Sequence, residues 1–120
     1  MDVKQEASNL IVAGSDTTGV TLTYLTWAVL QRPKLQAEIE EEVASLNGNI
    51  TDAEVEKLPL LNATIEETLR LYGAAPGGLP RIVPKGGSTL DGYYIPAGVT
   101  VTTQAWSMHR DENNFRDPMT

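Results

Sequence analysis

A short polar segment interrupts an apolar run near the start of the chain. Asp16, Thr17 and Thr18 follow Gly14 inside the run 10–30. Such groups cost free energy in an apolar helix unless each finds a partner. A threonine in mid-helix can donate to the carbonyl four residues earlier, here that of Ala13, and bend the helix. Gly14 leaves room for something to lie against the backbone. The pattern is typical of a polar notch beside a ligand.

Other interpretations of this segment stay open on spacing alone. It fits equally well a helix with a capped break, or two helices meeting at Ser15. Gly14-x-x-x-x-Gly19 followed by Val20 resembles a phosphate-binding loop whose lysine is replaced, which removes the key phosphate contact. Asp16-Thr17-Thr18-Gly19 is similar to an aspartic protease loop, but no second loop supplies the other carboxylate.

A second arrangement is Glu67-x-x-Arg70. Positions three apart share one face of a helix, so the two side chains can pair. Taken alone, the spacing is common and also fits a surface pair contributing about 0 to 1 kcal/mol.

Two further residues are candidates for binding a charged group. Arg81 follows a segment in which Pro76 and Pro80 restrict the backbone, and a rigidly aimed guanidinium suits a carboxylate or phosphate. His109 is the only histidine, and without a partner it is a poor metal ligand, so we predict no metal site among these residues.

The hydrophobic pattern predicts helices in the first part of the chain and short strands in the second. The first helix, about 2–31, is apolar nearly all round, which is typical of a helix in the middle of a larger structure. Helices are predicted at 33–46, from a capping box at 51–54 to Pro59, and at 60–72. Beyond Gly73, strands are predicted at 88–90, 93–95 and 99–103, with a hairpin turn at Asp91-Gly92. The last residues, 113–120, resemble a loop.

Length and composition exclude several classes of protein. The 120 residues, 13.0 kDa, correspond to at most one domain. With no cysteine, they contain no disulfide, thiolate metal site or cysteine nucleophile. The net charge of −7 argues against binding nucleic acid. There is no signal peptide pattern at the start and no apolar run long enough to span a membrane.

Much of the negative charge lies in one stretch, whose acidic residues we interpret as a solvated helical face. They are Glu38, Glu40, Glu41, Glu42, Asp52, Glu54, Glu56, Glu66 and Glu67.

The order and spacing of these motifs resemble the cytochrome P-450 family, the haem-thiolate monooxygenases. The matching segments are Ala13-Gly14-Ser15-Asp16-Thr17-Thr18, Glu66-Glu67-Thr68-Leu69-Arg70-Leu71-Tyr72, Leu79-Pro80-Arg81, Leu90-Asp91-Gly92-Tyr93-Tyr94-Ile95-Pro96-Ala97-Gly98, Met108-His109-Arg110-Asp111 and Phe115-Arg116-Asp117-Pro118. The resemblance covers nearly the whole chain. It implies a mainly α partial P-450 fold with a small β region: a central helix (1–32), following helices with Glu-x-x-Arg (33–72), and a β region with the start of the meander (73–120), all within one domain.

The same resemblance implies roles for the candidate residues. Asp16 and Thr17 correspond to the catalytic acid–alcohol pair that relays protons during dioxygen activation. The segment at Ala13 and Gly14 corresponds to the helix surface that faces the haem.

In the core and the β region, the resemblance implies supporting roles. Glu67 and Arg70 correspond to a buried pair that steadies the haem-binding core. Arg81 and His109 correspond to positions that bond haem propionates.

The resemblance also shows what these residues lack. The family's haem ligand is a cysteine beyond the meander, and this chain has none. We therefore expect an internal fragment, by itself inactive, of an enzyme that inserts one oxygen atom of dioxygen into a small organic substrate with electrons from a reductase. If the parent is eukaryotic, we expect it at the endoplasmic reticulum membrane, with the anchor missing here. The competing hypotheses are a haem-free helical interaction module and a degenerate phosphate-binding loop protein.

Overall fold

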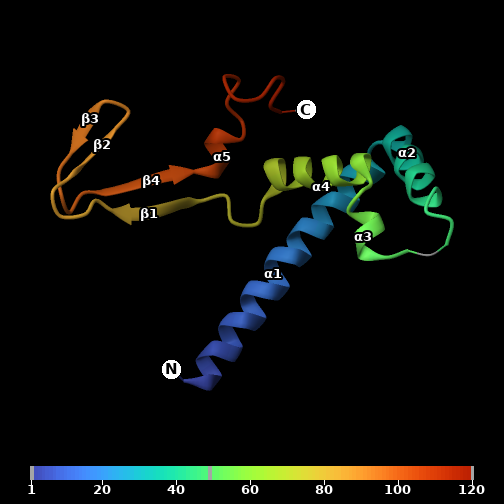
Figure 1. The fold of residues 1–120 in the computed structure, drawn as a ribbon, viewed down its shortest axis with the longest axis horizontal. Helices are drawn as coiled ribbons and strands as arrows, with labels where there is room; N and C mark the ends of the chain where they lie inside the picture. The colour runs from blue at the N-terminus through green and yellow to red at the C-terminus, as the bar shows by residue number, and fades with distance from the viewer. Residues whose placement is uncertain (1, 49, 120) are drawn as a thin grey trace. The chain divides into compact units, whose positions relative to one another are not determined.

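The computed structural model describes residues 2–48 and 50–119. The chain divides into two compact units, Met1–Ala75 and Pro76–Thr120 (Figure 1). The division falls close to Gly73, where the sequence pattern changes from helical to strand-forming. Each unit is described by itself.

The first unit begins with the long helix α1, Val3–Leu30. Asp2 caps it by accepting a hydrogen bond from the Lys4 amide (3.1 Å). The helix continues without a break through Gly14 and Gly19, so the capped break and the two-helix alternative are both wrong. The phosphate-binding and protease loops are wrong for the same reason, because both need the segment 14–19 to be non-helical.

Three shorter helices follow, close to the positions that the sequence predicts. They are α2 (Pro33–Ala44), α3 (Asp52–Val55) and α4 (Pro59–Tyr72). Prolines 33 and 59 occupy first-turn positions, where the missing N–H costs nothing. After α2, Asn47 and Gly48 adopt positive φ angles of 49° and 90°, which end the helical path.

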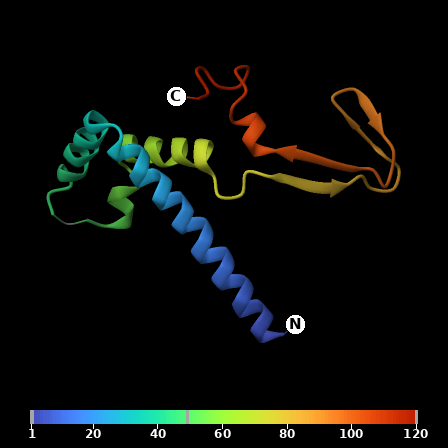
Figure 2. The ribbon, with the colours of Figure 1, turned by 180° about the vertical axis from the view of Figure 1, so that it is seen from behind.

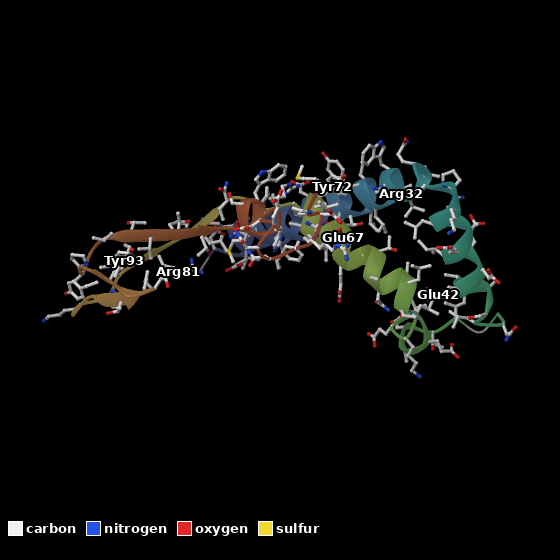
Figure 3. The ribbon with its side chains drawn as sticks, turned by 90° about the horizontal axis from the view of Figure 1, so that it is seen from above. Arg32, Glu42, Glu67, Tyr72, Arg81 and Tyr93 are labelled. Atoms are coloured by element: carbon white, nitrogen blue, oxygen red, sulfur yellow. The ribbon has the colours of Figure 1, made fainter. Side chains whose placement is uncertain are left out.

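Helix α4 packs against both α1 and α2, and crosses α1 in opposite views of the molecule (Figures 1 and 2). Leu58, Leu71 and Thr68 are its buried contacts. At its C-terminal end lies Tyr72, which Figure 3 labels, and the ring of Tyr72 stacks on that of Tyr24 with a centroid separation of 4.8 Å. Trp27 meets the same ring edge-on at 5.9 Å. These aromatic contacts join the end of α4 to α1.

The apolar character of α1 is not matched by burial in this structure. None of its described residues is buried, and Leu10 and Ile11 are 71% and 66% exposed. An apolar surface of this kind marks a site of contact with further protein or ligand. In the part of the chain that the structure describes, no helix is both long and apolar enough to cross a membrane.

The second unit contains two antiparallel strand pairs. Strand β1 (Gly78–Ile82) pairs with β4 (Thr100–Gln104), and β2 (Ser88–Leu90) pairs with β3 (Tyr93–Ile95). Asp91 and Gly92 both have positive φ, as the predicted hairpin turn requires. The sequence predicts β2 and β3 at these bounds and β4 one residue earlier, but it predicts neither β1 nor the short helix α5 (Ala105–Met108).

Strand β1 is hard to predict because Pro80 lies in its middle. Proline cannot donate to a strand ladder, so it normally argues against a strand. Among the strands of the described residues, β1 pairs with β4 alone, and Pro80 faces Thr102 in the register. An edge strand tolerates proline, since its other side needs no hydrogen-bond partner from the sheet.

Candidate functional site

The polar segment of α1 lies on the helix surface. The Thr17 hydroxyl donates to the Ala13 carbonyl oxygen at 2.7 Å, which confirms the predicted back-bond. The hydroxyl proton is therefore engaged, and the lone pairs of Oγ1 are left to accept a hydrogen bond from water or an acid. The neighbouring Asp16 is exposed, and its carboxylate makes no hydrogen bond or ion pair to any described residue.

The backbone beside this pair is open on one side. A Cβ placed on Gly14 would have no other atom within 4 Å. A second hydroxyl, that of Thr21, donates to the Thr17 carbonyl oxygen at 2.9 Å. The space beside Gly14 is thus open, next to a hydroxyl that can accept a hydrogen bond and an exposed carboxylate.

A groove runs from this segment toward α4. It has a volume of about 310 Å³ and is lined by Thr17, Thr18, Thr21, Leu22 and Leu69. Three of its five lining residues carry hydroxyls, so the groove can hold water beside Thr17.

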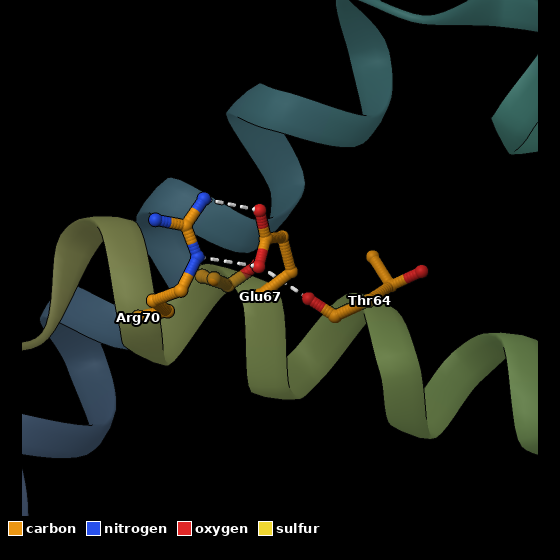
Figure 4. Close-up of polar contacts among 4 residues, drawn as sticks. Thr64, Glu67 and Arg70 are labelled. Atoms are coloured by element: carbon orange, nitrogen blue, oxygen red, sulfur yellow. Dashed lines mark hydrogen bonds and ion pairs between the residues drawn. The ribbon is translucent and has the colours of Figure 1, made fainter. Parts of the chain in front are cut away.

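Glu67 and Arg70 form a bidentate pair on α4 (Figure 4). Arg70 donates from Nε to one carboxylate oxygen at 2.7 Å and from Nη2 to the other at 2.5 Å. The Arg70 side chain is 10% exposed, whereas that of Glu67 is 48% exposed. Within the part of the chain that the structure describes, the cation of the pair is therefore largely covered, whereas its anion is half in water.

The pair shifts the titration of both groups. The hydrogen bond from Arg70 is the main cause that lowers the pKa of Glu67 below its ordinary 4.5. Burial opposes this effect, and the positive charge of Arg70 makes a smaller contribution that also lowers the pKa. The same hydrogen bond raises the pKa of Arg70, which stays charged throughout the neutral range.

This shift predicts a dependence of stability on acidity. Because the folded-state pKa of Glu67 is lowered, its contribution to the free energy of unfolding is fully present above about pH 4.5 and is lost as pH falls through the lowered pKa. The Glu67→Gln variant should lose stability less steeply than the parent between about pH 5 and 3. Urea unfolding of the two proteins over this range measures the difference. Identical slopes would show that Glu67 does not contribute through its charge.

The start of α4 is held by a residue of α2 that no sequence motif marks. Both carboxylate oxygens of Glu42, on α2, accept hydrogen bonds from α4 amides: Oε1 from Leu60 (2.8 Å) and Oε2 from Leu61 (2.9 Å). Glu42 is labelled in Figure 3. Its neighbours in the acidic stretch are mostly exposed, but Glu42 is partly buried, so the solvated-face interpretation is wrong for this residue. The only available signal is an uncapped Leu-Pro start of a predicted helix.

The second unit carries the remaining candidates. Arg81 lies on β1, opposite Val101, and is exposed; its Nη1 donates to the Pro80 carbonyl oxygen at 2.9 Å. His109 follows α5 and meets the Phe115 ring edge-on at 6.1 Å. Among the described residues, no group of three or more His, Cys, Asp or Glu side chains is placed to hold a metal ion.

Comparison with known proteins identifies the family. The family model described as Cytochrome P450 matches residues 1–120. The chain is 53% identical to the cytochrome P450 monooxygenase cypX of Dothistroma septosporum and 56% identical to the cytochrome P450 monooxygenase aflV of Aspergillus parasiticus, each over 99% of this chain and 23% of the relative. A solved structure of a zebra fish cytochrome P450, with progesterone, superposes on 95% of this chain and 28% of that one, with a TM-score of 0.82 and 27% identity. The chain therefore belongs to the cytochrome P450 family.

These matches confirm the predicted family and the partial, mainly helical fold with a few short strands. They do not favour the haem-free interaction module. The chain spans about a quarter of the length of the curated relatives it matches.

Proposed function

We propose that this chain supplies the proton-delivering helix and the core-stabilising Glu–Arg pair of a haem-dependent monooxygenase. The observation that supports this most directly is the geometry at Thr17 in a P450 family member. Its hydroxyl is held to Ala13 at 2.7 Å, and the free Asp16 carboxylate lies at the next position of the same helix.

The residues present fit part of a haem site. The open backbone at Gly14 and the adjoining Ala13 offer a surface on which a flat macrocycle can lie. We propose the exposed Arg81 guanidinium as a partner for a propionate, with His109 as a second candidate for the same role. When bound with a thiolate ligand, haem iron supplies the activation of dioxygen that inserts one oxygen atom into an organic substrate. None of the 120 residues is a cysteine, so that ligand is not among them.

Asp16 and Thr17 would handle the protons of this reaction. The Asp16 carboxylate is exposed and is the type of group that can act as a general acid or base. Because Thr17 has committed its own proton to Ala13, its oxygen accepts a hydrogen bond from a water and holds that water in one orientation. A proton leaving Asp16 through such a water reaches the face of the helix where Gly14 leaves space for the cofactor.

The other expectations for the full-length protein are also proposals. We propose a small organic substrate, a reductase as electron donor and, since the similar proteins named above come from eukaryotes, a location at the endoplasmic reticulum membrane. One similar protein, 42% identical over 118 residues, is named methylphloroacetophenone oxidase of Cladonia uncialis. An aromatic ketone is accordingly a reasonable first substrate to assay.

Haem binding tests the proposal. After reconstitution, the isolated chain should show no thiolate-type absorption band with carbon monoxide and no oxygenase activity, because it has no thiolate to bind iron. A full-length protein containing these residues should show the band. A thiolate-type band from the isolated chain, or no haem in the full-length protein, would contradict the proposal.

A further inference from the structure

Helix α4 starts without any cap of its own. Its N-cap residue is Leu58, which has no polar side chain and is buried, with 6% exposed. Its first helical residue is Pro59, which has no N–H. The amides of Leu60 and Leu61 come next, and backbone donors in the first turn have no acceptor within their own helix.

Glu42 satisfies both of these amides from another helix. Its two carboxylate oxygens accept one hydrogen bond each, at 2.8 and 2.9 Å, across 18 and 19 residues of sequence. A negative charge at this end also interacts favourably with the positive end of the α4 dipole. A single side chain of α2 therefore accepts hydrogen bonds from both of these first-turn amides of α4.

A neighbouring residue fixes the same turn to the chain that precedes it. The Asn62 side-chain amide donates to the carbonyl oxygens of Leu58 (2.6 Å) and Glu56 (3.0 Å). With Tyr72 stacked against α1 at the other end, α4 is held at both ends and carries Glu67 and Arg70 between them.

We propose that Glu42 is a positioning residue for the Glu67–Arg70 pair. Glu67 lies six residues beyond Leu61, or about 9 Å along a rigid helix, so the anchor on the first turn sets the place of the pair. The expected link between the pair and haem retention rests on the proposed function. The anchor itself is a property of α2 and α4.

The test uses the full-length haem protein with three variants. Glu42→Ala removes both acceptors, Glu42→Gln keeps one carbonyl oxygen, and Glu41→Ala is the matched control, an exposed glutamate one position earlier on α2. Two quantities are measured: hydrogen exchange of the Leu60 and Leu61 amides, and the rate of haem transfer to apomyoglobin.

We expect Glu42→Ala to accelerate exchange at both amides by roughly tenfold and to accelerate haem transfer several-fold. Glu42→Gln should protect one amide and fall between the parent and Glu42→Ala in haem transfer, whereas Glu41→Ala should match the parent. If Glu42→Ala does not fold, the Glu42→Gln result decides.

Two results would overturn the proposal. Unchanged exchange at Leu60 and Leu61 would show that the anchor does not form in solution. Faster exchange with an unchanged rate of haem transfer would show that the anchor does not position the pair. Absence of haem in the parent would instead contradict the proposed function, and it leaves the exchange measurement interpretable.

Discussion

Replacing Glu67 with alanine in the full-length protein is expected to destabilise it more than replacing Arg70. The side chain of Arg70 is only 10% exposed and Glu67 is its bidentate partner, so Glu67→Ala removes two hydrogen bonds and an ion pair from a largely covered charge. We expect a loss of about 2–4 kcal/mol in the free energy of unfolding, below the upper range for fully buried pairs because Glu67 is half exposed. Arg70→Ala leaves a carboxylate that water can solvate, and we expect about 1–2 kcal/mol. Both variants should lose haem content, Glu67→Ala the more.

The matched control is the exposed pair Lys34–Glu38, whose side chains are 92% and 49% exposed at a separation of 3.7 Å. Lys34→Ala should change the free energy of unfolding by no more than about 0.5 kcal/mol. Denaturant unfolding and haem content are measured for all three variants. If Glu67→Ala behaves like Lys34→Ala, the pair is only a surface contact, and if Arg70→Ala costs more than Glu67→Ala, the burial argument is wrong.

Replacing Thr17 with alanine is expected to uncouple the consumption of reduced nicotinamide from product formation. The Thr17 side chain contributes one hydrogen bond to its own helix and makes no other hydrogen bond among the described residues, so haem binding and iron reduction should survive. Without the hydroxyl oxygen, water is no longer held in line with Asp16. Product formed per reduced nicotinamide should fall by about tenfold or more, with hydrogen peroxide released instead.

Two variants act as controls for Thr17→Ala. Thr17→Ser keeps a hydroxyl and should restore most of the coupling. Thr18→Ala should have a much smaller effect, because the next residue points about 100° further round the helix. Product, peroxide and nicotinamide consumption are measured together. Unaltered coupling in Thr17→Ala would remove Thr17 from the mechanism. A larger loss of coupling in Thr18→Ala than in Thr17→Ala would show that Thr18, and not Thr17, has this role.

Local patterns predicted most of the helices and part of the β region. The helical spacing of apolar residues and the prolines at 33 and 59 place α2 and α4 within a few residues of their observed bounds. The Asp91-Gly92 turn places β2 and β3, because few other dipeptides adopt two successive positive φ angles at low cost. Strand β1 and helix α5 were not predicted, because β1 contains a proline and α5 is a single turn.

What the sequence alone determined is the set of contacts between residues close together in the chain. The Thr17 back-bond to Ala13 and the Glu67–Arg70 pairing span four and three residues, and helical periodicity dictates both. Only the tertiary structure decided that Arg70 is largely covered while Glu67 is half exposed, and that the Glu42 carboxylate accepts hydrogen bonds from the start of α4. The physical reason is that burial and long-range hydrogen bonds depend on which helices pack together, and no local spacing encodes a contact 18 residues away.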